Sequence, residues 1–455
     1  MGMVVYYVVP GGLAALLFAS LILKPRCKIN LTLLYLSITV FVYGTELFLR
    51  LPSPGIFRPR SYKDLYVLLT SVDRTTRGEK RILANLAAQF GVDVDTRDRL
   101  EVIADFRKRG TQAVPAIHPA WFLRQGEETV TVKSPISIAG VELQPLGGIA
   151  NKVTVLCNEN GPWVTYQSDK YGFHNPPGIW RSSRLEIAAV GDSFTQGHCA
   201  SSDKNFVALI RQQYPATLNL AMGGNGPLLE LATIKEYLRA AKPNVVLWFY
   251  YEGNDLTDLQ IEKRSKLLRR YLGEDFSQGL LGRQDDIDQA LTNQIAKREV
   301  DNQIKRGETI SKLVDAITLP ILRQKLGLVY GVNAQERADF EGPIMHDFLE
   351  ILLKAKTIVD AWRGILYFVY LPSWSSYAQS PHFSETLAIK KRAEVLYIVS
   401  SLGIPVIDVY PAFQAQSDPL SLFPFRQFGH YNEKGHRLVA REVLRKLSVA
   451  TDPAL

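Results

Sequence analysis

Cysteine is scarce in this 455-residue chain, which contains only Cys27, Cys157 and Cys199. So few cysteines exclude a disulfide-rich framework, and their spacing matches no common zinc motif. A single bridge between Cys157 and Cys199 could form outside the cytosol. Unpaired cysteines, however, commonly behave as small apolar side chains, and we therefore expect both to be unpaired. The sequence predicts no metal and no cofactor.

The chain also lacks any array of basic and aromatic side chains, although its net charge is +8 and its pI is near 9.1. Its lysines and arginines alternate with acids, as in "KREVDNQIKR". This pattern is typical of a solvated helix face, so we expect no nucleic-acid partner. Because 46% of the residues are apolar, the chain can bury a sizeable core. Its length predicts one large domain with attachments, or two domains.

Charge is absent from residues 3–23, which are long enough to cross the hydrocarbon core of a bilayer. In a second apolar run, residues 29–49, the only charged residue is Glu46. No basic segment precedes the first run, which disfavours a secretory signal peptide. We predict two transmembrane helices that form a membrane hairpin over residues 1–50 and contact membrane lipid. A single cleavable or re-entrant segment and a buried pair of core helices are the alternatives.

Positive charge is concentrated in the short connection between the two apolar runs, "KPRCK". Basic residues also follow the second run, at Arg50, Arg58, Arg60 and Lys63. The compact loop favours a cytoplasmic connection under the positive-inside rule. We accordingly expect a protein of the bacterial inner membrane whose body lies in the periplasm or outside the cell.

Regular alternation of strands and helices begins only at residue 185. Residues 51–184 are predicted to form a proline-rich stem and an N-terminal extension, helical over 61–125 and with short strands over 129–168. Residues 185–455 alternate apolar strands with helices, the strands lying at 185–190, 217–221, 244–251, 365–371 and 404–408. This alternation predicts an α/β fold, a three-layer sandwich with a five-stranded parallel sheet. Residues 256–345 exceed the length of a crossover and are interpreted as a helical insertion or lid.

Polar residues follow the predicted strands, at the edge where parallel sheets bind their ligands. The stretch "GDSFTQG" places Ser193 after the first strand, and "AMGGNGP" places Gly224 after the second. Asn254 in "EGND" follows the third strand, and His430 in "GHYNEKGH" precedes the last helix. Ser193 could act only as the N-cap of the next helix. Together, however, these groups would supply a nucleophile, oxyanion donors and a general base.

These four stretches, in this order, resemble the sequence blocks of the SGNH or GDSL-type hydrolases. The resemblance covers residues 185–447 apart from the insertion, and "SDKYGFHNP" just upstream is similar to a segment of membrane-anchored bacterial members. It implies a flavodoxin-like sandwich with Ser193 as nucleophile and His430 as base. The oxyanion hole would consist of the Ser193 N–H, the Gly224 N–H and the Asn254 side chain. The ordinary α/β-hydrolase elbow is excluded, because it requires glycine where Thr195 stands.

One departure from the family pattern concerns the acid that orients the histidine. The family usually carries an aspartate two or three residues before this histidine, where the present chain has Phe428 and Gln427. Asp418, in the loop leading to His430, is our first candidate for the acid. Asp408, at the end of the last strand, is the second candidate. A serine–histidine pair without an acid is the remaining alternative.

The resemblance implies acyl-ester chemistry, with acetyl esters of envelope carbohydrate as the leading substrate class and a lipid-like ester as a further one. Transfer to water would make the protein an esterase, and transfer to a sugar hydroxyl would make it an O-acyltransferase. The alternative from a different class is a catalytically silent protein that binds glycan or scaffolds an assembly, which the missing aspartate favours. A metal-dependent hydrolase is disfavoured, because His198 and Cys199 have no second ligand pair at a suitable spacing.

Overall fold

The structure is a computed structural model, and it describes residues 24–50, 84–123, 136–138, 140–182, 184–307, 334–378, 385–427 and 429–451. The chain divides into two compact units. One unit comprises residues 1–58 and 299–334, and the other comprises residues 59–298 and 335–455. The candidate site lies entirely within the second unit.

The first unit contains the helix α2, Pro25–Arg50, which covers the second apolar run of the sequence. The sequence predicts a transmembrane helix here. Among the residues that the structure describes, however, no helix combines the length and the apolar character needed to cross a membrane. The other predicted transmembrane helix, over residues 3–23, lies outside the described residues.

The main sheet of the second unit confirms the predicted α/β fold with five parallel strands. The strands lie in the order β10-β9-β8-β6-β7, and every neighbouring pair is parallel. Numbered along the chain, this order is 2-1-3-4-5, as in flavodoxin-like sheets. Each strand falls within its predicted range: β6 Ile187–Val190, β7 Thr217–Asn219, β8 Val245–Tyr251, β9 Ile365–Leu371 and β10 Val406–Asp408.

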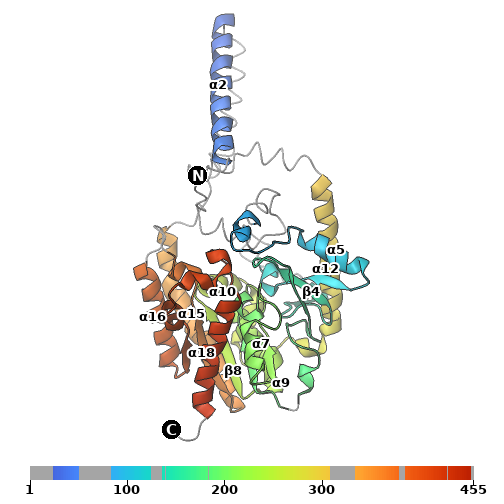
Figure 1. Ribbon diagram of the computed structural model, residues 1–455, viewed down its shortest axis with the longest axis vertical. Helices are drawn as coiled ribbons and strands as arrows, with labels where there is room; N and C mark the ends of the chain where they lie inside the picture. Colours follow the sequence, from blue (N-terminus) through green and yellow to red (C-terminus); the bar gives the residue numbers. More distant parts are fainter. Residues whose placement is uncertain are drawn as a thin grey trace. The chain divides into compact units, whose positions relative to one another are not determined.

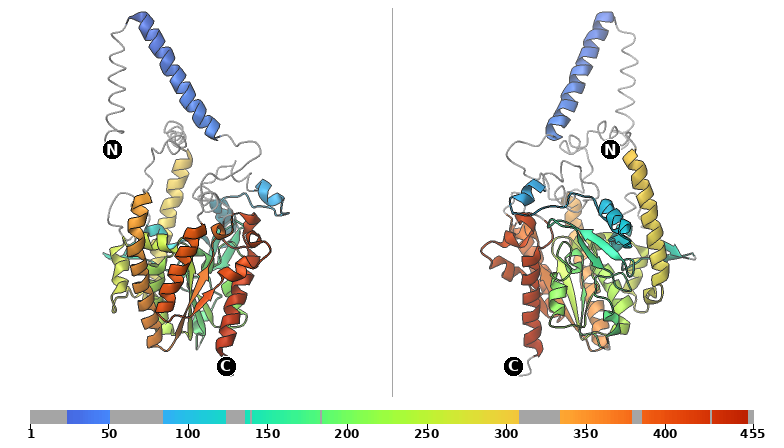
Figure 2. Two further views of the ribbon diagram at one scale, coloured as in Figure 1. Left: turned by 90° about the vertical axis from the view of Figure 1, so that its left-hand side faces the viewer. Right: turned by 45° about the vertical axis from the view of Figure 1, so that its right-hand side comes forward.

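Helices cover both faces of this sheet, which makes the three predicted layers (Figure 1). In β8, Trp248 belongs to one core cluster, and the next residue, Phe249, belongs to the other. The first cluster includes residues of α8 (Pro227–Thr233), α15 (Ala334–Ala361) and α16 (Glu385–Ser401). The second includes residues of α7 (Phe206–Arg211) and α18 (Glu433–Thr451). Figure 2 shows α15 and α18 on opposite sides of the strands.

The predicted insertion begins with helices that belong to the main core. They are α10 (Asp255–Glu262), α11 (Lys266–Arg269) and α12 (Gln284–Gly307). Buried leucines of this segment, including Leu259, Leu268 and Leu291, join the first core cluster. The segment up to residue 291 therefore packs as part of the domain. Residues 308–333 lie outside the described part of the chain.

Short helical turns complete the main domain. They are η3 Ile179–Arg181, α6 Ser193–Gln196, η4 Ile234–Leu238, α9 Arg239–Ala241, η5 Arg270–Leu272, η6 Leu280–Gly282, η7 Trp374–Ser376, α17 Tyr410–Gln414, η8 Pro419–Leu422 and η9 Pro424–Arg426. Of these, α6 is the most informative, because it begins at the candidate nucleophile.

The N-terminal extension forms a second, smaller sheet that is separate from the main one. Its strands β1 (Ala113–Pro115), β4 (Val153–Cys157) and β5 (Val164–Gln167) lie in the order β1-β4-β5. A two-stranded pair, β2 Ile136–Ile138 and β3 Val141–Leu143, accompanies it. The short strands predicted over 129–168 are thus present. The predicted helical stretch contains α5 Arg99–Lys108 and η2 Pro119–Phe122, but also strand β1.

A disulfide joins Cys157 to Cys199, with their Cα atoms 5.4 Å apart and a sequence separation of 42. The expectation that both cysteines are unpaired was therefore wrong. The bridge links the end of β4 in the small sheet to the loop that follows α6 in the main domain. Closing a loop of this length in the unfolded chain stabilises the native state by about 4 kcal/mol in the chain-entropy treatment.

Candidate active site

Ser193 is the first residue of α6, directly after the turn that leaves strand β6. The N-cap of this helix is Asp192, whose Oδ1 accepts a hydrogen bond from the Phe194 N–H at 2.9 Å. The Ser193 hydroxyl is therefore not needed for capping. Glycine is required at position 191, because a Cβ there would lie 2.4 Å from the Thr195 hydroxyl oxygen. The tight turn thus directs the serine hydroxyl towards the edge of the sheet.

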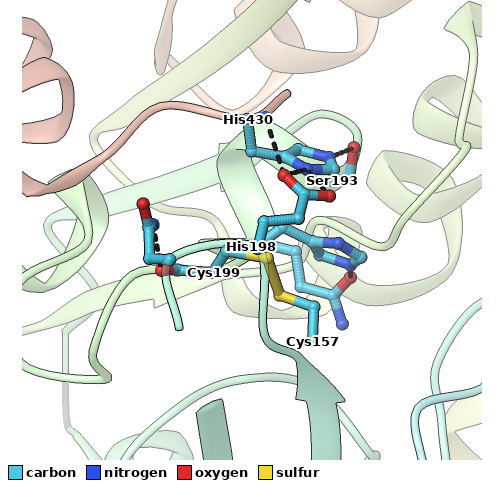
Figure 3. The surroundings of a disulfide bond; sticks show 8 residues. Cys157, Ser193, His198, Cys199 and His430 are labelled. Carbon is cyan, nitrogen blue, oxygen red and sulfur yellow. Dashed lines mark hydrogen bonds and ion pairs between the residues drawn. A yellow bond between two sulfur atoms is a disulfide. The ribbon is translucent and has the colours of Figure 1, made fainter. Parts of the chain in front are cut away.

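His430 lies in the loop between η9 and α18 and faces Ser193. The His430 Nε2 is 2.8 Å from the Ser193 Oγ, and both side chains are buried. Figure 3 shows the imidazole beside the serine, with the disulfide below both. This is the distance at which an imidazole accepts the hydroxyl proton of a nucleophile. The structure therefore brings together the two residues that the sequence predicts as nucleophile and base.

The acid beside His430 is Glu159, which the sequence analysis did not identify. Both Glu159 carboxylate oxygens lie 3.0 Å from the His430 Nδ1, and Oε2 also accepts the His430 backbone N–H at 3.0 Å. Glu159 is only 3% exposed. Such a carboxylate fixes the tautomer in which Nδ1 carries the proton and Nε2 is free to act as base.

The predicted acid, Asp418, has a different partner. Its carboxylate forms an ion pair with Arg426 at 2.5 Å. The second candidate, Asp408, pairs with Arg392 and accepts a hydrogen bond from the Tyr410 N–H. Both aspartates pair with nearby arginines, and the Nδ1 of His430 is occupied by Glu159. The structure therefore places Glu159, and neither predicted aspartate, beside His430, so the serine–histidine pair has an acidic neighbour.

Charges around His430 favour its protonated form. Burial by itself would lower the His430 pKa, but the Glu159 carboxylate, through its charge and its hydrogen bond, raises the pKa above the ordinary value, with help from Asp192. The neighbouring His198, whose ring centre is 4.7 Å from that of His430, has its pKa lowered by burial and by the His430 charge. The site thus stabilises one imidazolium, at His430, while His198 stays neutral.

The loop "AMGGNGP", which carries Gly224, is hydrogen-bonded through its backbone N–H groups to the stretch "GDSFTQG". The Met222 N–H donates to the Gly191 carbonyl at 3.3 Å, and the Gly223 N–H donates to Gln196 Oε1 at 2.8 Å. Gly224 has φ +72°, a left-handed conformation that glycine adopts without strain. The loop that carries the Gly224 N–H is therefore held beside α6, as a role in binding an oxyanion requires.

Asn254 is the N-cap residue of α10 and also lies near the nucleophile turn. Its Nδ2 donates to Asp258 Oδ2 at 2.8 Å, and its side chain is close enough to Asp192 to lower the pKa of that carboxyl. Burial has the larger effect on Asp192 and raises its pKa to about 6. Contact with the residue before Ser193 is consistent with the predicted oxyanion donor.

We expect the substitution Asn254→Ala to lower kcat for ester turnover about 10²–10³-fold, the usual effect of losing one oxyanion donor. KM should change much less, because the donor acts mainly on the charge that develops in the transition state. Steady-state kinetics of the purified variant would measure both constants, with its circular dichroism spectrum as a folding control. A decrease in kcat of less than about threefold would remove Asn254 from the oxyanion hole.

The upstream segment "SDKYGFHNP" connects the N-terminal extension to the main sheet. Asp169 accepts hydrogen bonds from the Phe173 N–H at 3.0 Å and from Asn175 Nδ2 at 2.9 Å. Asn175 in turn accepts the Asn219 N–H of β7 at 2.8 Å, and His174 Nδ1 contacts the Gln196 carbonyl at 2.8 Å. The segment thus fixes the end of α6 and the adjacent strand in place, which gives it a structural role at the site.

Several buried acids lie behind the oxyanion loops, on α8 and α10. Glu230 is fully buried, and within the described part of the chain neither of its carboxylate oxygens has a hydrogen-bond partner. Burial raises the pKa of Glu230 well above its usual value, and nearby Asp192 and Glu262 raise it further. Burial also raises the pKa of Glu262 to about 8, although its carboxylate accepts the Gly226 and Leu228 N–H groups.

The free energy of unfolding should depend on pH through Glu230. The native state keeps this carboxyl protonated at pH values where the unfolded chain releases the proton. Each pH unit above about 4.5 therefore destabilises the native state by about 1.4 kcal/mol, until the pKa in the folded state is reached. In Glu230→Gln this contribution is absent, so the variant should gain stability relative to the wild type between pH 5 and pH 8. Urea unfolding of the wild type and the variant at both pH values would measure this difference in the free energy of unfolding.

The surface substitution Glu274→Gln is the matched control, because Glu274 is exposed. It should leave the difference between the two pH values within about 0.5 kcal/mol of the wild type. The same pH dependence in Glu230→Gln and in the wild type would show that Glu230 ionises in the native state.

Among the described residues, one group places three potential metal-binding atoms within 4.8 Å of one another: Glu159, Cys199 and His430. The Cys199 sulfur is bonded to Cys157, and a disulfide sulfur lacks the thiolate charge that binds zinc. Glu159 and His430 are hydrogen-bonded to each other. This group therefore fits an acid–base pair beside a disulfide better than a metal site.

Glu159 escaped sequence analysis because it comes from the small sheet, 271 residues before its partner His430. One signal could have found it. A bridge between Cys157 and Cys199 would bring residue 159 close to the turn that carries Ser193, since each cysteine is only a few residues from one of these two positions. Because we expected both cysteines to be unpaired, the sequence analysis did not use this proximity of residue 159 to the Ser193 turn.

No family model matches this chain, and no curated protein is similar to it in sequence. Among solved structures, the chain has a similarity to a two-domain esterase active on acetylated mannans, at 12% identity and a TM-score of 0.31. The alignment covers 60% of the present chain and 50% of that esterase, so the chain spans about half of its length.

Two further structures are similar over most of their own length. The lipase/acylhydrolase from Enterococcus faecalis is 12% identical with a TM-score of 0.32, and the alignment covers 60% of this chain and 100% of the other. The acetyl xylan esterase AlAXEase is 10% identical with a TM-score of 0.33, with 58% and 100% covered. Likenesses at this level carry no argument about activity, which depends on the residues of the site.

Proposed function

We propose that this protein is a serine-dependent ester hydrolase of the SGNH type. The observation that carries the proposal is the buried hydrogen-bonded series Ser193–His430–Glu159, with 2.8 Å between the first pair and 3.0 Å between the second. A nucleophile, a base and an orienting acid at these distances form the arrangement that acyl transfer requires. The four sequence blocks that resemble this superfamily supply the same serine and histidine.

In the proposed reaction, the Ser193 oxygen attacks the acyl carbonyl while His430 Nε2 takes the hydroxyl proton. The carboxylate of Glu159 stabilises the imidazolium that forms. The oxyanion accepts hydrogen bonds from the Ser193 and Gly224 N–H groups and from Asn254. The Ser193 N–H is suited to this role, because N–H groups in the first turn of a helix have no partner within that helix. His430 then returns the proton to the leaving alcohol, and water releases the acyl group from the serine.

The substrate class that we propose is O-acyl, chiefly acetyl, esters of envelope carbohydrate. This part of the proposal depends on the resemblance of the four blocks to the superfamily and of "SDKYGFHNP" to a segment of its membrane-anchored bacterial members. An O-acyltransferase would use the same acyl-serine with a sugar hydroxyl in place of water. The catalytically silent alternative loses its main argument, since Glu159 takes the place of the missing aspartate.

The deciding experiment incubates one sample of the whole chain, in detergent, with a fluorophosphonate probe and a separate, untreated sample with O-acetylated polysaccharide. Covalent labelling together with release of free acetate is the expected result. Acetylated acceptor sugar without free acetate would identify a transferase. A protein that neither reacts with the probe nor turns over any acetyl ester would be a silent member, and the proposal would be wrong.

We further propose that the N-terminal apolar segment anchors the protein in the bacterial inner membrane, with the body in the periplasm or outside the cell. The uncharged residues 3–23 and the compact "KPRCK" loop support this orientation. The Cys157–Cys199 disulfide supports it independently, because structural disulfides persist mainly in oxidising compartments.

Reporter fusions after Leu455 would measure the orientation. Alkaline phosphatase, which needs an oxidising compartment, is expected to be active at this position, and a reporter that works only in the cytoplasm is expected to be inactive. The reverse pair of results would place the body in the cytoplasm. The chain without residues 1–50 serves as the cytoplasmic control, since it lacks both apolar runs.

A further inference from the structure

The disulfide connects the two segments that carry the acid and the nucleophile. Cys157 is the last residue of β4, two residues before Glu159, and Cys199 follows α6, which begins at Ser193. The Cys199 sulfur lies within 4.8 Å of a Glu159 carboxylate oxygen and a His430 ring nitrogen, and Figure 3 shows the bridge below Ser193 and His430. The two cysteines therefore hold together the loops on either side of the reacting groups.

In the part of the chain that the structure describes, no pairing between strands holds the Glu159 loop against the Ser193 turn. Within the described residues, β4 belongs to the three-stranded sheet, whereas β6 belongs to the five-stranded sheet, and the two sheets share no strand. The position of Glu159 relative to His430 thus depends on contacts between the loops. One such contact is the hydrogen bond from Asn160 Nδ2 to the Cys199 carbonyl, at 2.6 Å.

The bridge also lies in a buried, packed setting, where it restricts the position of Glu159 strongly. Cys157 and Cys199 are 7% and 2% exposed, and they pack with Ala116, Leu156 and Tyr166. A covalent link in a buried, packed setting leaves little freedom to the residue two positions further along. An error of about 1 Å in a catalytic group can lower a rate about 10²-fold.

We propose that the Cys157–Cys199 disulfide holds Glu159 against His430, so that both cysteines are positioning residues of the active site. The inference rests on the proposed function for its kinetic test. It makes the orientation of the histidine depend on a covalent bond between the N-terminal extension and the main domain. Without the bond, the Glu159 loop would sample positions in which the His430 Nδ1 has no carboxylate partner.

The first experiment removes the bridge with the double substitution Cys157→Ala and Cys199→Ala in the full-length protein. We expect kcat to fall about 10–10²-fold with little change in KM, because the acid acts on His430 and not on the bound ester. The acidic limb of the kcat/KM profile should move to lower pH, since His430 loses the carboxylate that raises its pKa. Asp192, His198 and His436, which are titratable and also interact with His430, remain in the variant.

A double-mutant cycle with Glu159→Gln separates positioning from general destabilisation. If the bridge acts through Glu159, removing it in the Glu159→Gln background should change kcat by less than about threefold. An equal loss of kcat in both backgrounds would mean that the bridge acts elsewhere, and the inference would be wrong. Unchanged kcat and pH profile after removal of the bridge would overturn it directly.

Three further variants keep the test decisive. Cys27→Ala removes the free, exposed cysteine and should have no effect. Val102→Ala weakens the packing of α5 on the small sheet without touching the site, so it should reduce stability and leave the pH profile unchanged. Asn160→Ala removes only the hydrogen bond to Cys199 and should shift kcat and the acidic limb in the same direction by a smaller amount, even if the double cysteine variant does not fold.

A measurement without substrate distinguishes failure of this inference from failure of the proposed function. The pKa of the His430 imidazole, followed by NMR of histidine-labelled protein and assigned with His430→Gln, should fall when the bridge or the Asn160 contact is removed. That decrease is expected whether or not the protein hydrolyses esters. If the wild type shows no turnover but the His430 pKa still falls in the variants, only the proposed function is refuted. If the His430 pKa is the same in the variants as in the wild type, the positioning role is refuted.

Discussion

Replacing Ser193 with alanine is expected to abolish fluorophosphonate labelling and to lower ester turnover by about 10⁴-fold or more. The physical reason is that the variant lacks the hydroxyl that attacks the acyl carbonyl and that lies 2.8 Å from the His430 Nε2 base. Loss of the nucleophile leaves only the catalysis supplied by substrate binding and the oxyanion donors. Gel fluorescence after labelling and steady-state kinetics on an activated acetyl ester would measure the two effects.

The fold of this variant should be unchanged, because Asp192 and not Ser193 caps α6. We expect the free energy of unfolding to change by no more than about 1 kcal/mol. Ser201→Ala is the matched control. Its hydroxyl donates to Glu433 at 3.3 Å, and the variant should label and turn over like the wild type. Full labelling of the Ser193→Ala variant would show that the nucleophile is another residue.

The second large effect is expected for Glu159→Gln, which removes the negative charge beside His430 with little change in shape. The amide can donate a hydrogen bond to Nδ1 and so favour the tautomer in which Nε2 carries the proton and cannot act as base. A neutral amide in place of the triad carboxylate lowers kcat about 10⁴-fold in serine hydrolases of this kind. We expect a loss of this order, measured by steady-state kinetics with a saturating ester.

The pH profile of this variant should also change in a defined direction. Glu159 raises the pKa of His430, and the base must be neutral to accept a proton. Without the carboxylate, His430 would stay neutral to lower pH, so the acidic limb of the kcat/KM profile should move to lower pH. A structural role for Glu159 would lower kcat without moving this limb.

Asp418→Asn is the matched control for Glu159→Gln, since Asp418 is the acid that the sequence predicts. Its ion pair with Arg426 is partly exposed, so the substitution should change kcat by less than about twofold. A steep loss in Asp418→Asn with normal turnover in Glu159→Gln would reverse the assignment and return the acid to the loop before His430.

The sequence by itself determined the main domain and most of its candidate site. The apolar runs that become β8 and β9 are too continuous for a sheet with one solvated face, which leaves a parallel sheet covered by helices on both sides. Once the strands are parallel, their carboxyl ends meet at one edge, so Ser193, Gly224 and Asn254 are brought near one another by topology. Local sequence was sufficient, because each residue directly follows the strand that positions it.

Only the tertiary structure decided the acid and the disulfide. Glu159 follows a strand of a different sheet, and nothing in the local pattern of "CNENG" indicates where that sheet packs. Asp418 is nearer to His430 in sequence, but Arg426 neutralises it at short range. Packing of the small sheet against the main domain brings Cys157 to Cys199 and thereby Glu159 to His430. Contacts between separately formed elements depend on the whole core, which sequence periodicity does not encode.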